Sequence, residues 1–268
     1  MFTLTAKAAW LTITTFLFGA AYADEQAIEV NIYAMQDSPP YSFLENEALS
    51  GIYTDIIRHA TDTMQGYKIN IFAVPFRRGL SFMQTGDGFA IYPPYYRPDS
   101  RPYIHPYSVP ILTEQITVFC QKKIFKNNKR LSWPEDYYRL RMATNSGYTM
   151  GGQSFWQAVK AGKIPIQQSE SHLRSVRLLA MNRVDCYLSD KLAFQWALRQ
   201  VKESEDAEQL NFDLLQGPVI SQEHGYLAFS AVEAKYPFKH DFIEQFNQAI
   251  ENMQRTGQID NIVKSYTE

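Results

Sequence analysis

Strand-like and helix-like segments alternate twice along the chain, and this alternation limits the possible folds more than any other feature of the sequence. Residues 28–34 alternate apolar and polar side chains, as a half-buried strand does. An amphipathic helical segment follows at 55–65, and a second strand-like segment follows at 68–74. Strands that alternate with helices predict parallel sheets, here in two similar α/β halves at about 27–114 and 115–223.

The stretch from Phe89 to Arg101 begins as a short apolar strand and breaks at Pro93-Pro94, which cannot donate hydrogen bonds to a sheet. Tyrosines and two arginines, Arg97 and Arg101, follow the break. A guanidinium binds a carboxylate through two parallel hydrogen bonds, so the stretch predicts a site for a small anion. A surface loop with solvated arginines is the alternative, and the stretch by itself leaves both open.

Other loops at predicted strand ends also carry aromatic or charged side chains, and this edge of an open α/β sheet is where ligands bind. The aromatic candidates are Tyr41, Phe43, Phe76, Tyr92, Tyr96 and Tyr148. Each could pack in a core instead, but their clustering at strand-end loops favours a ligand. Arg77 either reaches a cleft or pairs with an acidic neighbour on the surface. Asp190 either binds a ligand or only starts a helix, where the helix dipole stabilises a carboxylate.

The N-terminal 23 residues are expected to be a secretory signal peptide. Lys7 supplies a small positive region, residues 8–21 are mostly apolar, and Ala21-Tyr22-Ala23 has the pattern of a cleavage site. The apolar run is short for a membrane span, so an uncleaved anchor is the less favoured alternative. The protein is therefore predicted to be periplasmic.

Composition argues against several classes of function. A net charge of −2 does not favour nucleic acid, which needs a basic surface. The five histidines show no metal-binding spacing, so neither a metal nor a cofactor is expected. The 17 Tyr and 17 Phe exceed what a core requires, and some should face a ligand. Cys120 and Cys186 could pair in an oxidising compartment, but two distant cysteines are a weak signal, and two free thiols are favoured.

Across nearly the whole mature chain, the sequence resembles the periplasmic solute-binding proteins of bacterial ABC transporters, in the branch that binds polar amino acids. The order and spacing of several short segments together carry the resemblance. They are Pro39-Pro40-Tyr41-Ser42-Phe43, Gly51-Ile52-Tyr53-Thr54-Asp55, Pro75-Phe76-Arg77, the arginine that ends Arg97-Pro98-Asp99-Ser100-Arg101, the loop 145–149, the segment 182–190 and the C-terminal 256–266.

The resemblance implies an α/β, two-lobed, periplasmic-binding-protein-like (type II) fold with a ligand cleft between the lobes. Two strands would cross between the lobes. Residues 24–114 would form the first part of lobe 1, residues 115–223 lobe 2, and residues 224–268 would return to lobe 1.

The resemblance also implies roles for individual residues. Arg101 would hold the α-carboxylate of the ligand, Asp190 would receive its ammonium group, and Phe76 would pack on its side chain. The loop 145–149 would add backbone and hydroxyl contacts through Asn145, Tyr148 and Thr149. This chain differs from the family where Pro93, Pro94 and Tyr96 replace small hydroxyl residues and where Phe89 replaces an acidic residue, so the identity of the ligand does not carry over.

These features favour a binding protein without catalysis that delivers an amino acid or similar small zwitterion to a membrane permease, acting as a monomer. A sensory module that works through a membrane partner is one alternative. A periplasmic dehydratase-like enzyme on the same fold is another. Catalysis would need a general acid or base in the cleft, where the sequence indicates Asp190 and no obvious His or Glu.

Overall fold

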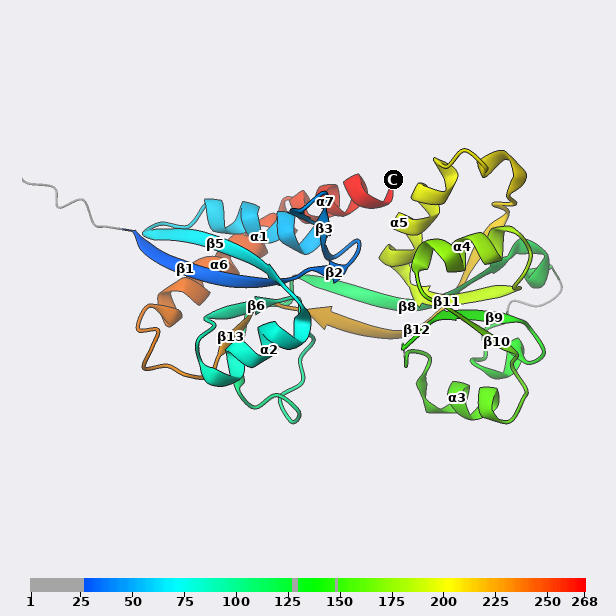
Figure 1. Ribbon diagram of the computed structural model, residues 1–268, viewed down its shortest axis with the longest axis horizontal. Helices are drawn as coiled ribbons and strands as arrows, with labels where there is room; N and C mark the ends of the chain where they lie inside the picture. Colours follow the sequence, from blue (N-terminus) through cyan, green and yellow to red (C-terminus); the bar gives the residue numbers. More distant parts are fainter. Residues whose placement is uncertain (1–26, 127–129, 148) are drawn as a thin grey trace, which may run out of the picture.

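The computed structural model describes residues 27–126, 130–147 and 149–268, so the expected signal peptide lies outside the described residues. Two groups of elements, each built on a five-stranded sheet, lie side by side and are joined by two long strands (Figure 1). We call the group that contains the first sheet lobe 1 and the group that contains the second sheet lobe 2. No helix in the described ranges is long and apolar enough to cross a membrane.

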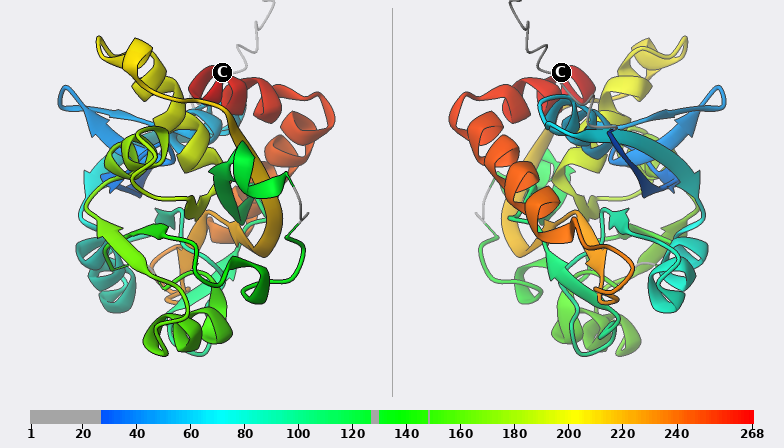
Figure 2. Two further views of the ribbon diagram at one scale, coloured as in Figure 1. Left: turned by 90° about the vertical axis from the view of Figure 1, so that its right-hand side faces the viewer. Right: turned by 90° about the vertical axis from the view of Figure 1, so that its left-hand side faces the viewer.

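Lobe 1 is a mixed sheet with helices on both faces. In sheet order its strands are β5 (Tyr67–Val74), β1 (Ile28–Met35), β6 (Ala90–Tyr92), β13 (Ala228–Ser230) and β7 (Ile104–Tyr107). Its helices are α1 (Ile52–Asp62), α2 (Phe76–Thr85), α6 (Lys239–Arg255) and α7 (Gln258–Thr267). The main core includes apolar residues of β1, α1 and α6, and a smaller core includes residues of α2, β6 and β13. The ribbons of α6 and α2 lie on opposite sides of the sheet (Figure 2). Strand β1 pairs in parallel with both β5 and β6, as the strand–helix alternation predicts.

A small antiparallel sheet follows β1 and positions Tyr41, which lines the cleft. It consists of β2 (Asp37–Ser38), β3 (Ser42–Glu45) and β4 (Ala48–Ser50). The sequence pattern predicts a loop that carries Tyr41 and Phe43 here, but Phe43 lies in a strand, because Asp37 pairs with Phe43 and Ser38 with Ser42. The turn between β2 and β3 carries Tyr41 and holds it at the side of lobe 1 that faces lobe 2.

Lobe 2 repeats the sheet-and-helix plan. In sheet order its strands are β10 (Ile166–Ser169), β9 (Met142–Asn145), β11 (Cys186–Asp190), β8 (Leu112–Gln121) and β12 (Leu214–Gly225). Its helices are α3 (Gly152–Lys160), α4 (His172–Ala180) and α5 (Lys191–Lys202), and short 3₁₀ turns occupy Lys122–Phe125, Glu135–Tyr137 and Ala207–Gln209. Helix α4 begins after Ser171, whose hydroxyl accepts a hydrogen bond from the Arg174 N–H. Lobe 2 has two hydrophobic core clusters. One contains apolar residues of α3, and the other contains apolar residues of α4 and α5.

The long strands β8 and β12 connect the lobes and pair with each other in antiparallel fashion (Figure 1). Glu114 of β8 lies directly opposite Glu223 of β12. The register of β12 shifts between Gln216 and Ser221, around Gly217-Pro218. A proline cannot donate a ladder hydrogen bond, which accounts for the irregular pairing at this point.

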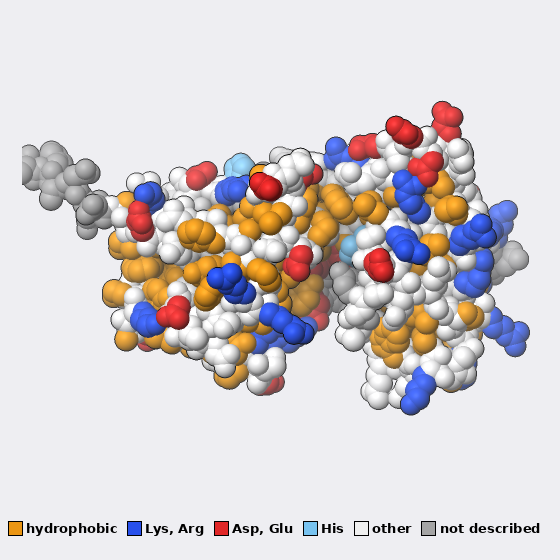
Figure 3. Space-filling model, in the orientation of Figure 1, with side chains coloured by type: hydrophobic (Ala, Val, Ile, Leu, Met, Phe, Trp, Pro, Cys, Tyr) orange, Lys and Arg blue, Asp and Glu red, His pale blue; other side chains and the backbone are white. Residues whose placement is uncertain are grey.

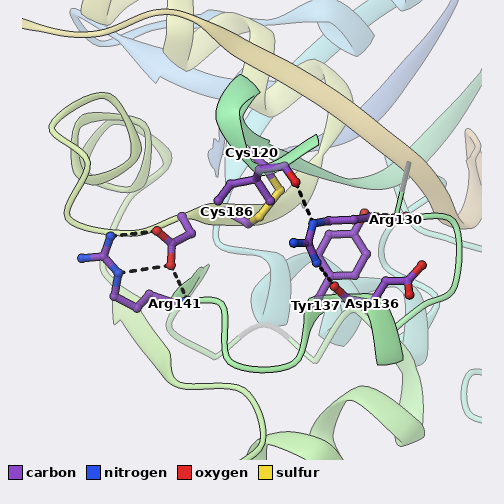
Figure 4. Close-up of a disulfide and its surroundings, with 8 residues drawn as sticks. Cys120, Arg130, Asp136, Tyr137, Arg141 and Cys186 are labelled. Atoms are coloured by element: carbon purple, nitrogen blue, oxygen red, sulfur yellow. Dashed lines mark hydrogen bonds and ion pairs between the residues drawn. A yellow bond between two sulfur atoms is a disulfide. The ribbon is translucent and has the colours of Figure 1, made fainter. Parts of the chain in front are cut away.

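A disulfide joins Cys120 of β8 to Cys186 of β11 (Figure 4). The two residues are direct partners on neighbouring antiparallel strands, with their Cα atoms 4.0 Å apart. The preference for two free thiols is therefore wrong. Sequence separation alone could not show that strands 66 residues apart would place the two cysteines opposite each other.

Candidate ligand-binding cleft

A cleft of about 800 Å³ lies between the lobes and is lined by residues of both lobes and of the two crossing strands. In the space-filling view, the cleft opens as a hollow between the two lobes (Figure 3). Six of the residues singled out from the sequence line it: Tyr41, Phe76, Arg97, Arg101, Thr149 and Asp190. Lobe 1 supplies the first four, and lobe 2 supplies Thr149 and Asp190.

Four other candidates lie elsewhere. Tyr92 is fully buried in lobe 1, where its hydroxyl donates to Thr54 Oγ1 at 3.1 Å. Tyr96 is 54% exposed and packs edge-on against Tyr107. Phe43 packs against Trp196 of α5, and Arg77 is exposed on α2.

Asn145 lines a second, smaller pocket of about 270 Å³ between β2 and the start of α4. Its Oδ1 accepts hydrogen bonds from the hydroxyls of Ser175 and Tyr187, both at 3.0 Å. These bonds hold the end of β9 against α4 and β11. Tyr148 lies outside the described residues.

Arg101 presents its guanidinium to the cleft from lobe 1. The group lies 5.1 Å from the centre of the Phe76 ring, at the first turn of α2, which orients it without neutralising it. No ion-pair partner of Arg101 occurs among the described residues. Arg97, the other arginine of the stretch, forms an ion pair with Glu223 at 2.8 Å. Of these two arginines, Arg101 is therefore the one whose charge no described carboxylate neutralises.

Asp190 begins a helix and also lines the cleft. It is the N-cap of α5, where its Oδ1 accepts a hydrogen bond from the Ala193 N–H at 2.9 Å. The Tyr41 hydroxyl, from lobe 1, donates to the same oxygen. Oδ2 is buried and has no hydrogen-bond donor within the described residues. Burial raises the pKa of Asp190, and the hydrogen bond from Tyr41 opposes that rise.

Glu114 is a cleft residue that the sequence analysis missed. Its side chain is 3% exposed, Tyr53 donates to Oε1 at 2.7 Å, and Tyr95 donates to Oε2 at 2.5 Å. Burial, followed by the negative charge of Asp190, raises the pKa of Glu114 to about 8. The strand pattern contained a signal, because Glu114 occupies the same inward face as Leu112 and Ile116.

A glycine allows Tyr53 to reach this carboxyl group. A Cβ atom on Gly225 of β12 would lie 1.8 Å from the Tyr53 hydroxyl oxygen. Any side chain at position 225 would therefore displace the phenol. The close approach of backbone and phenol is a reason for glycine at the end of this crossing strand.

The expectation that the cleft holds no obvious His or Glu is wrong. Glu114, Glu223 and His172 all line it. Burial lowers the pKa of His172 to about 4, so the ring is neutral near pH 7, and its Nδ1 lies 2.7 Å from the Tyr187 hydroxyl. The histidine begins α4, and sequence spacing gave no indication that this helix starts beside the cleft.

Solved structures share this fold. An ancestral cationic amino acid solute binding protein (AncCDT-1) matches with a TM-score of 0.67 at 17% identity, over 90% of this chain and 96% of that one. The second substrate binding domain of a putative amino acid ABC transporter from Streptococcus pneumoniae Canada MDR_19A matches with a TM-score of 0.66 at 17% identity, over 89% of this chain and 100% of that domain. A histidine kinase sensor domain with similarity to periplasmic binding proteins matches with a TM-score of 0.59 at 15% identity, over 90% and 97% of the two chains.

These likenesses show the fold, which is the two-lobed type II fold of periplasmic binding proteins, as expected from the sequence. No curated protein matches the chain by sequence. A family model, that of the bacterial extracellular solute-binding proteins, family 3, matches residues 30–268. That match covers nearly all of the described residues, and the chain belongs to the bacterial extracellular solute-binding proteins, family 3.

Proposed function

We propose that the protein captures an amino acid or a similar small zwitterion in the cleft and delivers it to an ABC-type permease. The observation that carries the proposal is a pair of opposite charges on opposite walls. Arg101 of lobe 1 presents a guanidinium that has no ion-pair partner among the described residues. Asp190 of lobe 2 has a buried oxygen that accepts no hydrogen bond from them. A guanidinium suits a carboxylate, and a carboxylate oxygen suits an ammonium group.

The aromatic side chains near these charges support a small organic ligand. Phe76 and Tyr41 line the cleft beside Arg101 and Asp190. They supply apolar contact area and exclude water, which strengthens the interaction of charged groups with a ligand. Binding sites for small molecules commonly combine apolar walls with a few polar groups in this way.

The cleft favours binding over catalysis. Glu223 is held in its ion pair with Arg97, and both oxygens of Glu114 accept hydrogen bonds from phenols. His172 is neutral near pH 7 and contacts Tyr187. A general acid or base must reach the reacting atom, and Glu223 and His172 are engaged with protein partners. We therefore propose a binding protein that is not an enzyme and is located in the periplasm.

Sensing through a membrane partner is the second candidate. The likeness to a histidine kinase sensor domain favours it, because that domain has the same fold. Genes for a permease and an ATPase beside this one would support import, and a sensor gene in their place would support sensing.

The test begins with a thermal-shift screen of α-amino acids and related zwitterions. A ligand at 100 times its Kd should raise the free energy of unfolding by about 2.7 kcal/mol. Calorimetry then compares the wild type with Arg101→Gln and Asp190→Asn. Loss of one partner of a buried, hydrogen-bonded charge pair costs roughly 2–5 kcal/mol, so each variant should bind about 30-fold to several-thousand-fold more weakly.

Ligand analogues identify which end of the ligand each residue holds. A decarboxylated amine should be nearly insensitive to Arg101→Gln, and a deaminated acid nearly insensitive to Asp190→Asn. Asparagine is itself a good N-cap, so Asp190→Asn should keep the melting temperature of the free protein, whereas Asp190→Ala should lower its stability by about 1 kcal/mol. If both charge variants keep native affinity, the opposed-charge site is wrong and Asp190 is only a helix cap.

A further inference from the structure

The cleft contains one more carboxyl group than a simple zwitterion would use. Arg97 and Glu223 neutralise each other in their ion pair, and His172 is neutral near pH 7. Among the described residues, the cation of Arg101 and the carboxyl groups of Asp190 and Glu114 also line the walls. A ligand with one carboxylate and one ammonium group would match Arg101 and Asp190. It would leave Glu114 protonated and without a ligand contact of its own.

Glu114 and Asp190 lie close together. Tyr41 donates to Asp190, Tyr53 donates to Glu114, and the centres of the two phenol rings are 5.8 Å apart. Each Glu114 oxygen accepts one phenol hydrogen bond and retains a second lone pair. The carboxyl group can therefore accept another donor without releasing either tyrosine.

The groups that face Glu114 come from every element around it. Tyr53 comes from α1, Tyr95 from the segment after β6, Asp190 from the end of β11, and Glu223 from β12. All of these groups are phenols or carboxyl groups, and Arg97, which lies over the ring of Tyr95, is already held by Glu223. Such surroundings disfavour an isolated negative charge on Glu114 and favour a cation beside it. The faces of the phenol rings would add cation–π attraction.

We propose that Glu114 is a specificity residue that selects a ligand with a second cationic group, such as a dibasic amino acid whose side chain ends in an ammonium or guanidinium group. The inference rests on the proposed function for the other two contacts, with Arg101 holding the carboxylate and Asp190 the α-ammonium group. The second cation would lie against Glu114 at the floor of the cleft, between the crossing strands and the tyrosines. On binding, it would replace the Glu114 proton, which leaves to solvent.

Matched probes test this selection. L-Arginine and L-citrulline have nearly the same shape, but only arginine has a charged side chain. Agmatine keeps both cationic groups of arginine and lacks the carboxylate. Wild-type protein should bind arginine at least about 30-fold more tightly than citrulline, the lower bound for a buried charge pair. In Glu114→Gln the loss of affinity should be about 30-fold greater for arginine than for citrulline.

Calorimetry of the wild type in two buffers of different ionisation enthalpy gives an independent measurement. Near pH 7, arginine should release a large fraction of one proton per molecule bound, and citrulline should release none. This comparison needs no variant, so it remains decisive if Glu114→Gln fails to fold.

The outcomes separate the inference from the proposed function. If citrulline or other neutral amino acids bind as tightly as arginine and no proton is released, the role of Glu114 is overturned while the zwitterion site stands. If agmatine binds with proton release and no α-amino acid binds, the zwitterion site fails and the role of Glu114 stands. If neither arginine nor agmatine binds, the inference is wrong.

Discussion

At the scale of single residues, the protonation of Glu114 links the cleft to the stability of the free protein. Burial raises the pKa of this carboxyl from 4.5 to about 8, so the folded protein binds the proton more tightly than the unfolded chain does. The stabilising contribution of the protonated group is therefore fully present below about pH 4.5 and is lost as the pH rises through about 8. The pKa of Asp190 is also raised, and it acts in the same direction.

The variant Glu114→Gln keeps the side chain neutral at every pH. Without ligand, its melting temperature relative to the wild type should therefore rise as the pH increases from 5 to 9. Differential scanning calorimetry at several pH values measures this difference. A difference between the two proteins that stays constant across the range would show that Glu114 titrates as an ordinary exposed carboxyl group.

The sequence was informative about single residues where a motif placed them at the end of a strand. Arg101, Asp190, Phe76 and Tyr41 were all selected in this way, and all four line the cleft. Tyr92 was selected on the same ground but faces α1, because successive side chains of a strand point to opposite faces. Glu114 was missed because the hydrogen bonds that hold its buried carboxyl group come from tyrosines in distant segments of the chain, which the local sequence does not reveal.

At the scale of elements, the disulfide links β8 to β11 within the second sheet. It closes a loop of 66 residues, which in the chain-entropy model raises the free energy of unfolding by about 4 kcal/mol. The double variant Cys120→Ala, Cys186→Ala should therefore melt roughly 10 °C lower than the oxidised wild type. Thermal melts with and without reductant measure this effect, and the double variant, which should not respond to reductant, is the control.

Thiol counting on denatured, unreduced protein provides the direct check of the bridge. Oxidised wild type should show no reactive thiol. Two reactive thiols would contradict the bridge, and the expected difference in melting temperature would then disappear.

The segments predicted at 28–34, 55–65 and 68–74 agree with β1, α1 and β5 to within a few residues, because each carries its own apolar periodicity. The sequence did not identify β12 and β7. Both strands contain proline, Pro218 in β12 and Pro106 in β7, and β12 has an irregular register around its proline. Pairing of these strands depends on partners far away in the chain, which local patterns do not contain.

At the scale of the whole molecule, the lobes already touch on the side where α5 lies. Arg199 of α5 donates to the Ser265 carbonyl of α7 at 2.7 Å, and Trp196 of α5 packs against Phe43 of β3. The opposite side, between α2 and α3, is where the cleft is open (Figures 1 and 3). Closure around a ligand should therefore bring the start of α3 towards α2, with bending in the crossing strands.

The two charged groups proposed to hold the ligand lie on different lobes, so binding should be coupled to this closure. Small-angle X-ray scattering should show a smaller radius of gyration when the ligand found by the thermal-shift screen is added. Arg101→Gln at the same ligand concentration is the matched control, because it should bind too weakly to close and should keep the scattering curve of the free protein. An unchanged radius of gyration for wild-type protein with calorimetrically confirmed binding would contradict closure, and the ligand would then have to bind one wall of an open cleft.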